Sequence, residues 1–249
     1  MIFVYSSTGN SLQLAEAVAS EIGDEVMNIL DVPEGPVDVS MYDRVGFVTP
    51  VYFFNTPRIL RAFIDRLVAR DGQEFFLVLT CGSTPDRACR KATRYFRKRG
   101  LDLTHSFAYR MPENYIALFS PPKGDTIDRM LDSVPVFAKE IAGHLSSEPC
   151  IISKHIGLLG LLTVFGDTAY DIMRGTKGFH VDDGCIGCGL CERICPDKAI
   201  RIEDGKPVWV IQKCEHCMGC INRCPRSVIQ YKRRTQRRTR YVNPRVKLR

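Results

Sequence analysis

"MIFVYSSTGNS", residues 1–11, joins a run of large apolar residues to a short loop of hydroxyl side chains, and it decides how the N-terminal part folds. The apolar run is typical of a buried strand. The loop supplies four hydroxyl groups and a glycine, Gly9, without an acidic residue. It also opens a helical pattern, and the free N–H groups and dipole of a helix start favour a phosphate. We therefore expect a strand, a phosphate loop and a helix here, with simple helix capping by Ser or Thr as the alternative.

Apolar runs alternate with helical patterns as far as residue 145. The expected strands are residues 1–5, 25–30, 44–50, 74–80 and 103–111, and the expected helices are residues 11–22, 56–69, 85–99 and 125–145. Near-continuous apolar strands between helices indicate a parallel sheet that is covered on both faces. The sequence therefore predicts a doubly wound α/β domain with a five-stranded parallel sheet.

Three further loops follow strands of this sheet, where ligands bind in such folds. "TPVYFFNTP", residues 49–57, carries aromatic rings that can stack on a planar cofactor or pack in the core. "TCGST", residues 80–84, is small and contains a glycine, so backbone groups can approach a ring edge. "RMPENY", residues 110–115, follows the last strand and is a candidate for the same cleft.

The phosphate loop resembles that of flavodoxins, which has the form [ST]xTGx[ST], here Ser6, Thr8, Gly9 and Ser11. The resemblance covers residues 1–145 and implies a flavodoxin-like domain that binds FMN. The implied FMN-binding residues are Ser6, Ser7, Thr8, Gly9, Asn10 and Ser11 at the phosphate, Pro50, Val51, Tyr52, Phe53, Phe54 and Asn55 over one flavin face, and Thr80, Cys81, Gly82 and Ser83 at the pyrimidine end. The second loop lacks the tryptophan of most flavodoxins, which leaves open which ring stacks.

Eight of the eleven cysteines lie in two copies of one pattern, CxxCxxCxxxCP. The copies are "CIGCGLCERICP", residues 185–196, and "CEHCMGCINRCP", residues 214–225. Three thiolates at this spacing wrap one corner of an iron–sulfur cluster, and in the bacterial two-cluster spacing the fourth cysteine of each run ligates the other cluster. We therefore expect one 4Fe-4S cluster on Cys185, Cys188, Cys191 and Cys224, and the other on Cys214, Cys217, Cys220 and Cys195.

This repeat resembles bacterial-type two-cluster ferredoxins over residues 178–231, which implies a small α+β domain. Asp204 and Gly205 lie between two strand patterns and predict a hairpin turn, with Trp209 in the packing. Structural zinc is the alternative for the cysteines, although zinc sites place their ligand pairs farther apart. His216 is a candidate ligand, or a solvated or hydrogen-bonding histidine.

The two resemblances together are typical of the flavodoxin–ferredoxin fusion family of anaerobes. Such a chain is expected to be an electron-transfer protein that passes electrons between FMN and two 4Fe-4S clusters and adapts one- and two-electron partners. Two alternatives stay open: a flavin-dependent reductase of a small-molecule acceptor, and an iron–sulfur regulatory protein that binds nucleic acid. Whether the chain is a carrier or an oxidoreductase is therefore not decided. The start of the chain has no export pattern, which predicts a cytoplasmic protein with reduced thiols.

Two segments lie outside these domains. Residues 146–177 contain the apolar stretch "IGLLGLLTVFG", which is too short to span a membrane and predicts a packed connecting helix, a dimer interface or a membrane-skimming patch. Residues 232–249 form a basic tail. Counted from Arg226, the chain ends with ten basic and no acidic residues, so the net charge of +7 leaves the remainder at −3. We expect the tail to dock an acidic redox partner or to compensate the clusters, with nucleic acid the less favoured partner.

Overall fold

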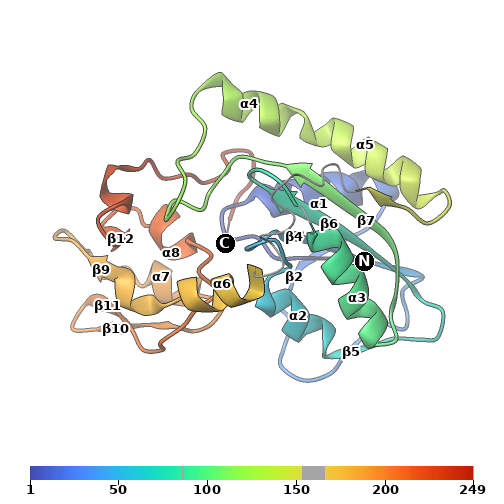
Figure 1. The fold of residues 1–249 in the computed structure, drawn as a ribbon, viewed down its shortest axis with the longest axis horizontal. Helices are drawn as coiled ribbons and strands as arrows, with labels where there is room; N and C mark the ends of the chain where they lie inside the picture. The colour runs from blue at the N-terminus through green and yellow to red at the C-terminus, as the bar shows by residue number, and fades with distance from the viewer. Residues whose placement is uncertain (86, 153–165, 249) are drawn as a thin grey trace.

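The structure is a computed structural model that describes residues 1–85, 87–152 and 166–248. A parallel sheet forms the centre of the N-terminal domain (Figure 1), with the strand order β2-β1-β4-β6-β7-β8. Its strands are β1 (Ile2–Val4), β2 (Val26–Asn28), β4 (Arg44–Pro50), β6 (Glu74–Cys81), β7 (Asp102–Arg110) and β8 (Ile151–Ile152). The first five have the doubly wound order expected, and all neighbours are parallel. β8 adds a two-residue strand beside β7, at the edge.

Helices cover both faces of this sheet because its strands are apolar on both sides. Along β6, for example, Phe75 and Leu77 pack into one buried cluster, and Phe76 and Val78 pack into the other. Helices α1 (Asn10–Ile22) and α5 (Val134–Leu145) bury their apolar faces in the second cluster. Helices α2 (Arg58–Ile64) and α3 (Ala88–Lys98) cover the opposite face. The expected two-sided α/β domain is thereby confirmed.

Two expected helices are divided in the structure. The pattern at residues 125–145 forms α4 (Asp125–Asp132) and α5, which meet at Ser133. Pro135 explains the break, because proline lacks an N–H group and its ring clashes with the carbonyl four residues earlier. The pattern at residues 56–69 forms a helix only to Ile64, and β5 (Leu67–Val68) then pairs with β3 (Val37–Asp38).

The C-terminal domain consists of short elements around the cysteines. They are α6 (Gly166–Met173), a 3-10 turn (Thr176–Gly178), β9 (Phe179–Val181), α7 (Leu190–Arg193), β10 (Ile200–Glu203), β11 (Lys206–Trp209), α8 (Gly219–Asn222), β12 (Ile229–Tyr231) and a second 3-10 turn (Thr235–Arg237). Asp204 and Gly205, both with positive φ, join β10 to β11, so the predicted hairpin is confirmed. The Trp209 ring stacks on Phe179 at 5.0 Å, which confirms its place in the packing.

The connecting segment is described in part. Residues 146–152 and 166–177 are described, whereas nearly all of its apolar stretch lies outside the described residues. Within the part of the chain that is described, no helix has the length and apolar character needed to cross a bilayer.

Candidate functional site

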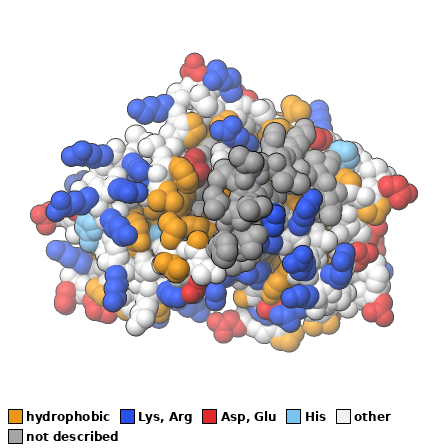
Figure 2. Space-filling model, viewed as in Figure 1, with side chains coloured by type: hydrophobic (Ala, Val, Ile, Leu, Met, Phe, Trp, Pro, Cys, Tyr) orange, Lys and Arg blue, Asp and Glu red, His pale blue; other side chains and the backbone are white. Residues whose placement is uncertain are grey.

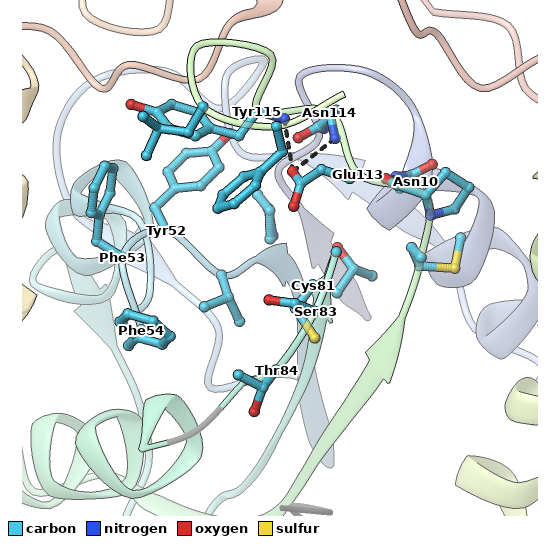
Figure 3. A pocket seen from close by; sticks show the side chains of 18 of the residues that line it. Asn10, Tyr52, Phe53, Phe54, Cys81, Ser83, Thr84, Glu113, Asn114 and Tyr115 are labelled. Atoms are coloured by element: carbon cyan, nitrogen blue, oxygen red, sulfur yellow. Dashed lines mark hydrogen bonds between the residues drawn. The ribbon is translucent and has the colours of Figure 1, made fainter. Parts of the chain in front are cut away.

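A cleft opens at the carboxyl ends of β4, β6 and β7, where the sequence predicts a ligand. Most of the residues expected there line it: Asn10, Pro50, Val51, Tyr52, Phe53, Phe54, Thr80, Cys81, Gly82 and Ser83. In Figure 3, Phe53 and Phe54 come from the loop after β4, while Cys81 ends β6 and Ser83 comes from the loop after it. Asn55 lines a neighbouring groove instead. The cleft is therefore a slot between an aromatic loop and a small loop, a shape that suits a planar ring.

The aromatic loop is a tight two-residue turn. Tyr52 and Asn55 exchange backbone hydrogen bonds of 2.9 and 3.0 Å. Phe53 and Phe54 between them have φ values of 48° and 61°. Such a turn requires positive φ at both central positions, which bulky residues rarely adopt, and strained residues of this kind concentrate at functional sites. Both rings line the cleft, and Phe53 also stacks on Tyr170 of α6 at 5.0 Å and meets the edge of Tyr115.

The loop after β7 completes the cleft, as the candidate residues 110–115 suggest. Met111, Pro112, Glu113, Asn114 and Tyr115 all line it. The Glu113 carboxylate accepts the backbone N–H groups of the next two residues at 2.9 and 2.8 Å (Figure 3). It lies so close to the loop after β6 that a Cβ on Gly82 would overlap it. The phosphate loop itself has no acidic residue, but the cleft receives one from this third loop.

The hydroxyl groups of the phosphate loop are bonded to protein partners. Ser7 Oγ donates to Cys217 O at 3.2 Å, and Asn114 Nδ2 donates to Thr8 Oγ1 at 2.5 Å. Ser11 Oγ lies 2.8 Å from Thr80 Oγ1, and Ser6 Oγ accepts the Gly9 N–H. Of the loop, only Asn10 lines the cleft. The loop thus ties the two domains together in this structure.

The backbone of the same loop offers N–H groups that an anion could accept. The N-cap residue of α1 is Gly9, so none of the hydroxyl side chains occupies the capping position. Among the hydrogen bonds between described residues, none uses the N–H groups of Asn10, Ser11 or Leu12. Asn10 and Ser11 are buried, and buried donors without partners are rare unless a ligand accepts them. The residues present therefore fit a phosphate at the backbone and a flavin ring in the cleft.

The basic tail folds back onto the phosphate loop. The Asn243 N–H donates to Thr8 O at 2.8 Å, and the Tyr241 hydroxyl donates to Asn10 Oδ1 at 2.6 Å. Arg240 donates to four oxygens of residues 227–235, and Arg245 pairs with Asp132 at 2.9 Å. These four tail residues are therefore engaged in contacts within the protein. The sequence does not predict this contact, because it joins residues more than 230 positions apart.

The two cysteine runs line two separate cavities. The first cavity is lined by Cys185, Cys188, Cys191 and Cys224, together with Cys220. The second is lined by Cys214, Cys217, Cys220 and Cys195. Each cavity thus includes the fourth cysteine of the opposite run, which fits the expected crossing. In the described part of the chain, no three His, Cys, Asp or Glu side chains converge on a point that would hold a single metal ion.

His216 lies between the cleft and the second cavity, and it lines both. Its Nδ1 is 2.8 Å from the Tyr115 hydroxyl, while its Nε2 is buried without a partner among the described residues. Burial, followed by the charge of Lys232, lowers the pKa of the imidazole to about 4, so the ring is neutral. His216 is therefore a hydrogen-bonding histidine, as one of the sequence alternatives proposes.

Glu215 joins the second cysteine run to helices α2 and α6. Its Oε1 accepts the Arg58 N–H at 2.7 Å, and its carbonyl accepts the Tyr170 hydroxyl at 2.7 Å. Burial, and then the negative charge of Asp197, raises the pKa of its carboxyl to about 7. Together with the bonds of Ser7 and His216, these contacts place the second run directly against the cleft.

Comparisons with known families agree with both halves of this site. A family model described as a flavodoxin domain matches residues 1–112, and one described as a 4Fe-4S dicluster domain matches residues 184–229. The chain is a flavodoxin–ferredoxin fusion. It carries the two kinds of domain that the sequence patterns predict, in the order predicted.

Relatives match this fusion over short segments. It is 43% identical over 56 residues to one subunit of the Na(+)-translocating ferredoxin:NAD(+) oxidoreductase complex of Acetobacterium woodii, which is 22% of this chain and 16% of that protein. It is 35% identical over 65 residues to Ferredoxin 7Fe of Hydrogenibacillus schlegelii, which is 26% of this chain and 77% of that protein. The fusion thus spans less than a fifth of the length of the first of these relatives.

Solved structures match the flavodoxin half. A flavodoxin from the domain Archaea aligns over 59% of this chain and 97% of its own, with 15% identity and a TM-score of 0.39. NAD(P)H:quinone oxidoreductase from Methanothermobacter marburgensis aligns over 59% of this chain and 94% of its own, with 13% identity and a TM-score of 0.42.

Proposed function

We propose that the fusion transfers electrons between one FMN in the cleft and two 4Fe-4S clusters in the ferredoxin domain. The FMN ring would lie between the turn at Tyr52–Asn55 and the loop after β6, with its phosphate at the N–H groups of α1. Cys214, Cys217, Cys220 and Cys195 would hold the proximal cluster, and Cys185, Cys188, Cys191 and Cys224 the distal one.

One observation carries this proposal: the cleft and the two separate cysteine cavities adjoin each other in a row, because neighbouring ones share a lining residue. His216 lines the cleft and the proximal cavity, and Cys220 lines the proximal and the distal cavity. An electron that leaves the cleft by this route meets the cluster of the second run first. The repeat alone does not give the order of the clusters, and this sharing supports the proposed one.

The exposure of the cysteines supports the same order. Cys214 is buried, and the backbone of Cys217 contacts the phosphate loop. Cys188 is exposed, and Cys185 is half-buried. The distal cavity therefore lies nearest the solvent, where an outside protein would exchange electrons.

The protein's own residues position the cofactors and keep water away from the path between them. FMN supplies a group that exchanges electrons singly or in pairs, whereas each cluster exchanges them one at a time. The buried rings of Tyr5 and Tyr52 meet edge to face, and both interact with Cys217 of the second run. Nε2 of His216 has no protein partner among the described residues, and Ser7 fixes the backbone of Cys217.

Anaerobic purification followed by electron transfer tests the proposal. About eight iron atoms and one FMN per chain are expected. A pre-reduced bacterial ferredoxin, used as a one-electron donor, should then bleach the flavin absorbance rapidly. Cys188→Ser and Cys214→Ser should each slow the bleaching and lower the iron content. Equal bleaching rates in the wild type and both variants, or bound zinc in place of iron, would contradict the proposed route.

A small-molecule reductase is the second candidate function. Phe119, which lines the cleft, is 54% exposed, so the cleft opens to solvent beside it. A small acceptor would reach the flavin there without a protein partner. Rapid turnover of such an acceptor by the reduced protein alone would favour this function over a carrier.

A further inference from the structure

A basic groove lies beside the flavin cleft, between α2 and α3. It is lined by Arg61 of α2, by Asn55 and Tyr95, and by Arg87, Arg90, Lys91, Arg94 and Lys98. The α3 cations recur at helical spacing, so they share one face of the helix. The net charge of the chain, +7, does not reveal this cluster. Residues 87–99 alone carry seven basic residues and no acidic one. Figure 2 shows Lys and Arg side chains gathered over α3 at the right of the view, apart from those of the ferredoxin domain.

Four cations of the groove lack anionic partners within the described part of the chain. Arg87, Arg90, Arg94 and Lys98 make no ion pair with any other described residue. Asp65, which directly follows α2, is already bonded to Arg99 at 2.7 Å and to the Tyr95 hydroxyl at 2.5 Å. Several like charges on one face repel each other, and an anion bound in the groove would relieve this repulsion.

Arg61 gives a second, independent indication of a ligand. Its Nε atom is buried and has no hydrogen-bond partner among the described residues. The charge of Arg61 favours ionisation of Glu215, but no hydrogen bond between described residues joins the two side chains. A guanidinium donor that is buried and unpaired costs free energy unless an acceptor enters the groove.

We propose that this groove binds a small ligand carrying two or more phosphate groups. Its volume of about 500 Å³ lies within the range of small-molecule sites. Arginines at 87, 90 and 94 offer planar forks that match phosphate, and the face from Arg87 to Lys98 is about 16 Å long. The groove is concave, so a narrow phosphate group can enter it and the half-buried Arg61 side chain can turn to meet it, whereas a flat protein surface would contact only the rim.

The groove adjoins the mouth of the cleft. Asn55 lines the groove and closes the turn whose Phe54 lines the cleft. Thr84 lines the cleft and Arg87 lines the groove, three positions apart on one loop. A ligand with its phosphates in the groove would therefore extend its remaining part toward the flavin. The site is separate from the FMN phosphate site at α1, which lies on the other side of the cleft beside Asn10.

Calorimetric titration of the FMN-saturated, cluster-loaded protein with ADP and with inorganic pyrophosphate tests the proposal, with adenosine as the uncharged comparison. Both phosphate probes should bind, and adenosine should not. Arg90→Ala/Arg94→Ala should weaken phosphate binding about tenfold or more. The matched control is Arg233→Ala/Arg237→Ala in the tail, which removes two exposed arginines and should change the affinity less than about twofold. ADP binding tighter than pyrophosphate would identify a nucleotide, and equal binding a free phosphate ligand.

The proposal is overturned if neither phosphate probe binds, or if the control variant weakens binding as much as the groove variant. It is also overturned if the groove variant leaves phosphate binding unchanged but slows electron transfer to an acidic protein, because the surface would then dock a protein. Flavin and cluster absorbance should be unchanged in all variants. The binding readout needs no electron transfer, so this inference and the proposed function can fail separately.

Discussion

The hydroxyl of Tyr115 and Nδ1 of His216 lie 2.8 Å apart, and they join a cleft loop of the flavodoxin domain to the second cysteine run. The bond orients an imidazole ring that lines both the cleft and the proximal cavity. Its Nε2 is left as a buried group without a partner among the described residues. Hydrogen bonds to cluster sulfurs stabilise the more negative, reduced state and so raise the reduction potential.

Replacement of His216 by phenylalanine should therefore lower the midpoint potential of the proximal cluster and leave that of the distal cluster unchanged. A redox titration followed by spectroscopy of both clusters measures the two potentials. Tyr115→Phe is the matched control, since it removes the bond to Nδ1 but keeps the imidazole. It should shift the proximal potential less. An unchanged potential in His216→Phe would show that Nε2 does not bond to the cluster.

Replacement of the fourth cysteine of either run by serine should remove the cluster of the opposite run. Cys195→Ser should behave like Cys214→Ser and lose the proximal cluster, because Cys195 lines the proximal cavity. Cys224→Ser should behave like Cys185→Ser and lose the distal one. Each variant should keep about four of about eight iron atoms. Iron analysis and the rate of flavin reduction distinguish the two groups, and a Cys195 variant that resembles Cys185→Ser would exclude the crossing.

Local patterns predict much of this molecule. The apolar runs predict the five main strands because both faces of the sheet are buried, and Asp204 with Gly205 predicts the hairpin because a two-residue turn needs positive φ. The cysteine spacing also predicts the crossing of the ligands, which the replacement of Cys195 and Cys224 would test. For the strands and the hairpin, the residues that decide the structure are neighbours in the chain.

Contacts between distant residues could not be predicted in this way. Tyr241 bonds to Asn10 across 231 positions, and neither residue carries a pattern that identifies the other. The engagement of the Ser7 hydroxyl depends likewise on Cys217, which the packing of the domains brings there, and that of Thr8 on Asn114, which the fold of its own domain brings there. The groove on α3 was missed for another reason: charge was summed over the whole chain, although residues 87–99 carry seven basic residues at helical spacing. Only the fold adds Arg61 and Asn55 to them.

Gly9 and the tail should be coupled energetically. Gly9 has a φ of 101°, and a Cβ there would lie 2.8 Å from both Asn243 Cβ and Val246 Cγ2. Gly9→Ala should therefore destabilise the flavodoxin domain through backbone strain of about 1–3 kcal/mol, with the clash in addition.

A double-mutant cycle separates these two costs. Removal of residues 241–249 takes away the clash but leaves the strain, so Gly9→Ala should cost less in the shortened chain than in the full one. Near-UV circular dichroism during thermal unfolding measures each variant, and release of FMN on dilution gives a second readout. The same cost in both backgrounds would show that the tail does not cover Gly9 in solution.

Replacement of Phe54 in the two-residue turn should change stability and FMN affinity in opposite directions. Phe54→Gly removes an unfavourable positive φ and should keep or raise the melting temperature, while FMN affinity should fall roughly tenfold because an aromatic wall of the cleft is lost. Phe53→Gly is the matched control. It relieves similar strain but also loses the stack on Tyr170, so its melting temperature should fall. Fluorescence titration with FMN measures the affinity, and unchanged FMN binding in Phe54→Gly would exclude Phe54 from the flavin site.

Cys81 should be almost inert to alkylation in the folded protein at neutral pH. It is buried in the wall of the cleft, and burial, followed by the charges of Cys89 and Glu113, raises the pKa of its thiol to about 12. Since only the thiolate reacts, the reactive fraction at pH 8 is about one in ten thousand, and it should rise about tenfold per pH unit toward pH 12.

The unfolded chain, with a thiol pKa of about 8.5, loses this proton first. The stabilisation from the protonated thiol is therefore complete below about pH 8.5 and decreases as the pH rises. Iodoacetamide labelling with mass analysis of the Cys81 peptide, compared with half-exposed Cys150 and with urea-unfolded protein, measures this. Rapid labelling of folded Cys81 at pH 8 would contradict its burial in the cleft wall.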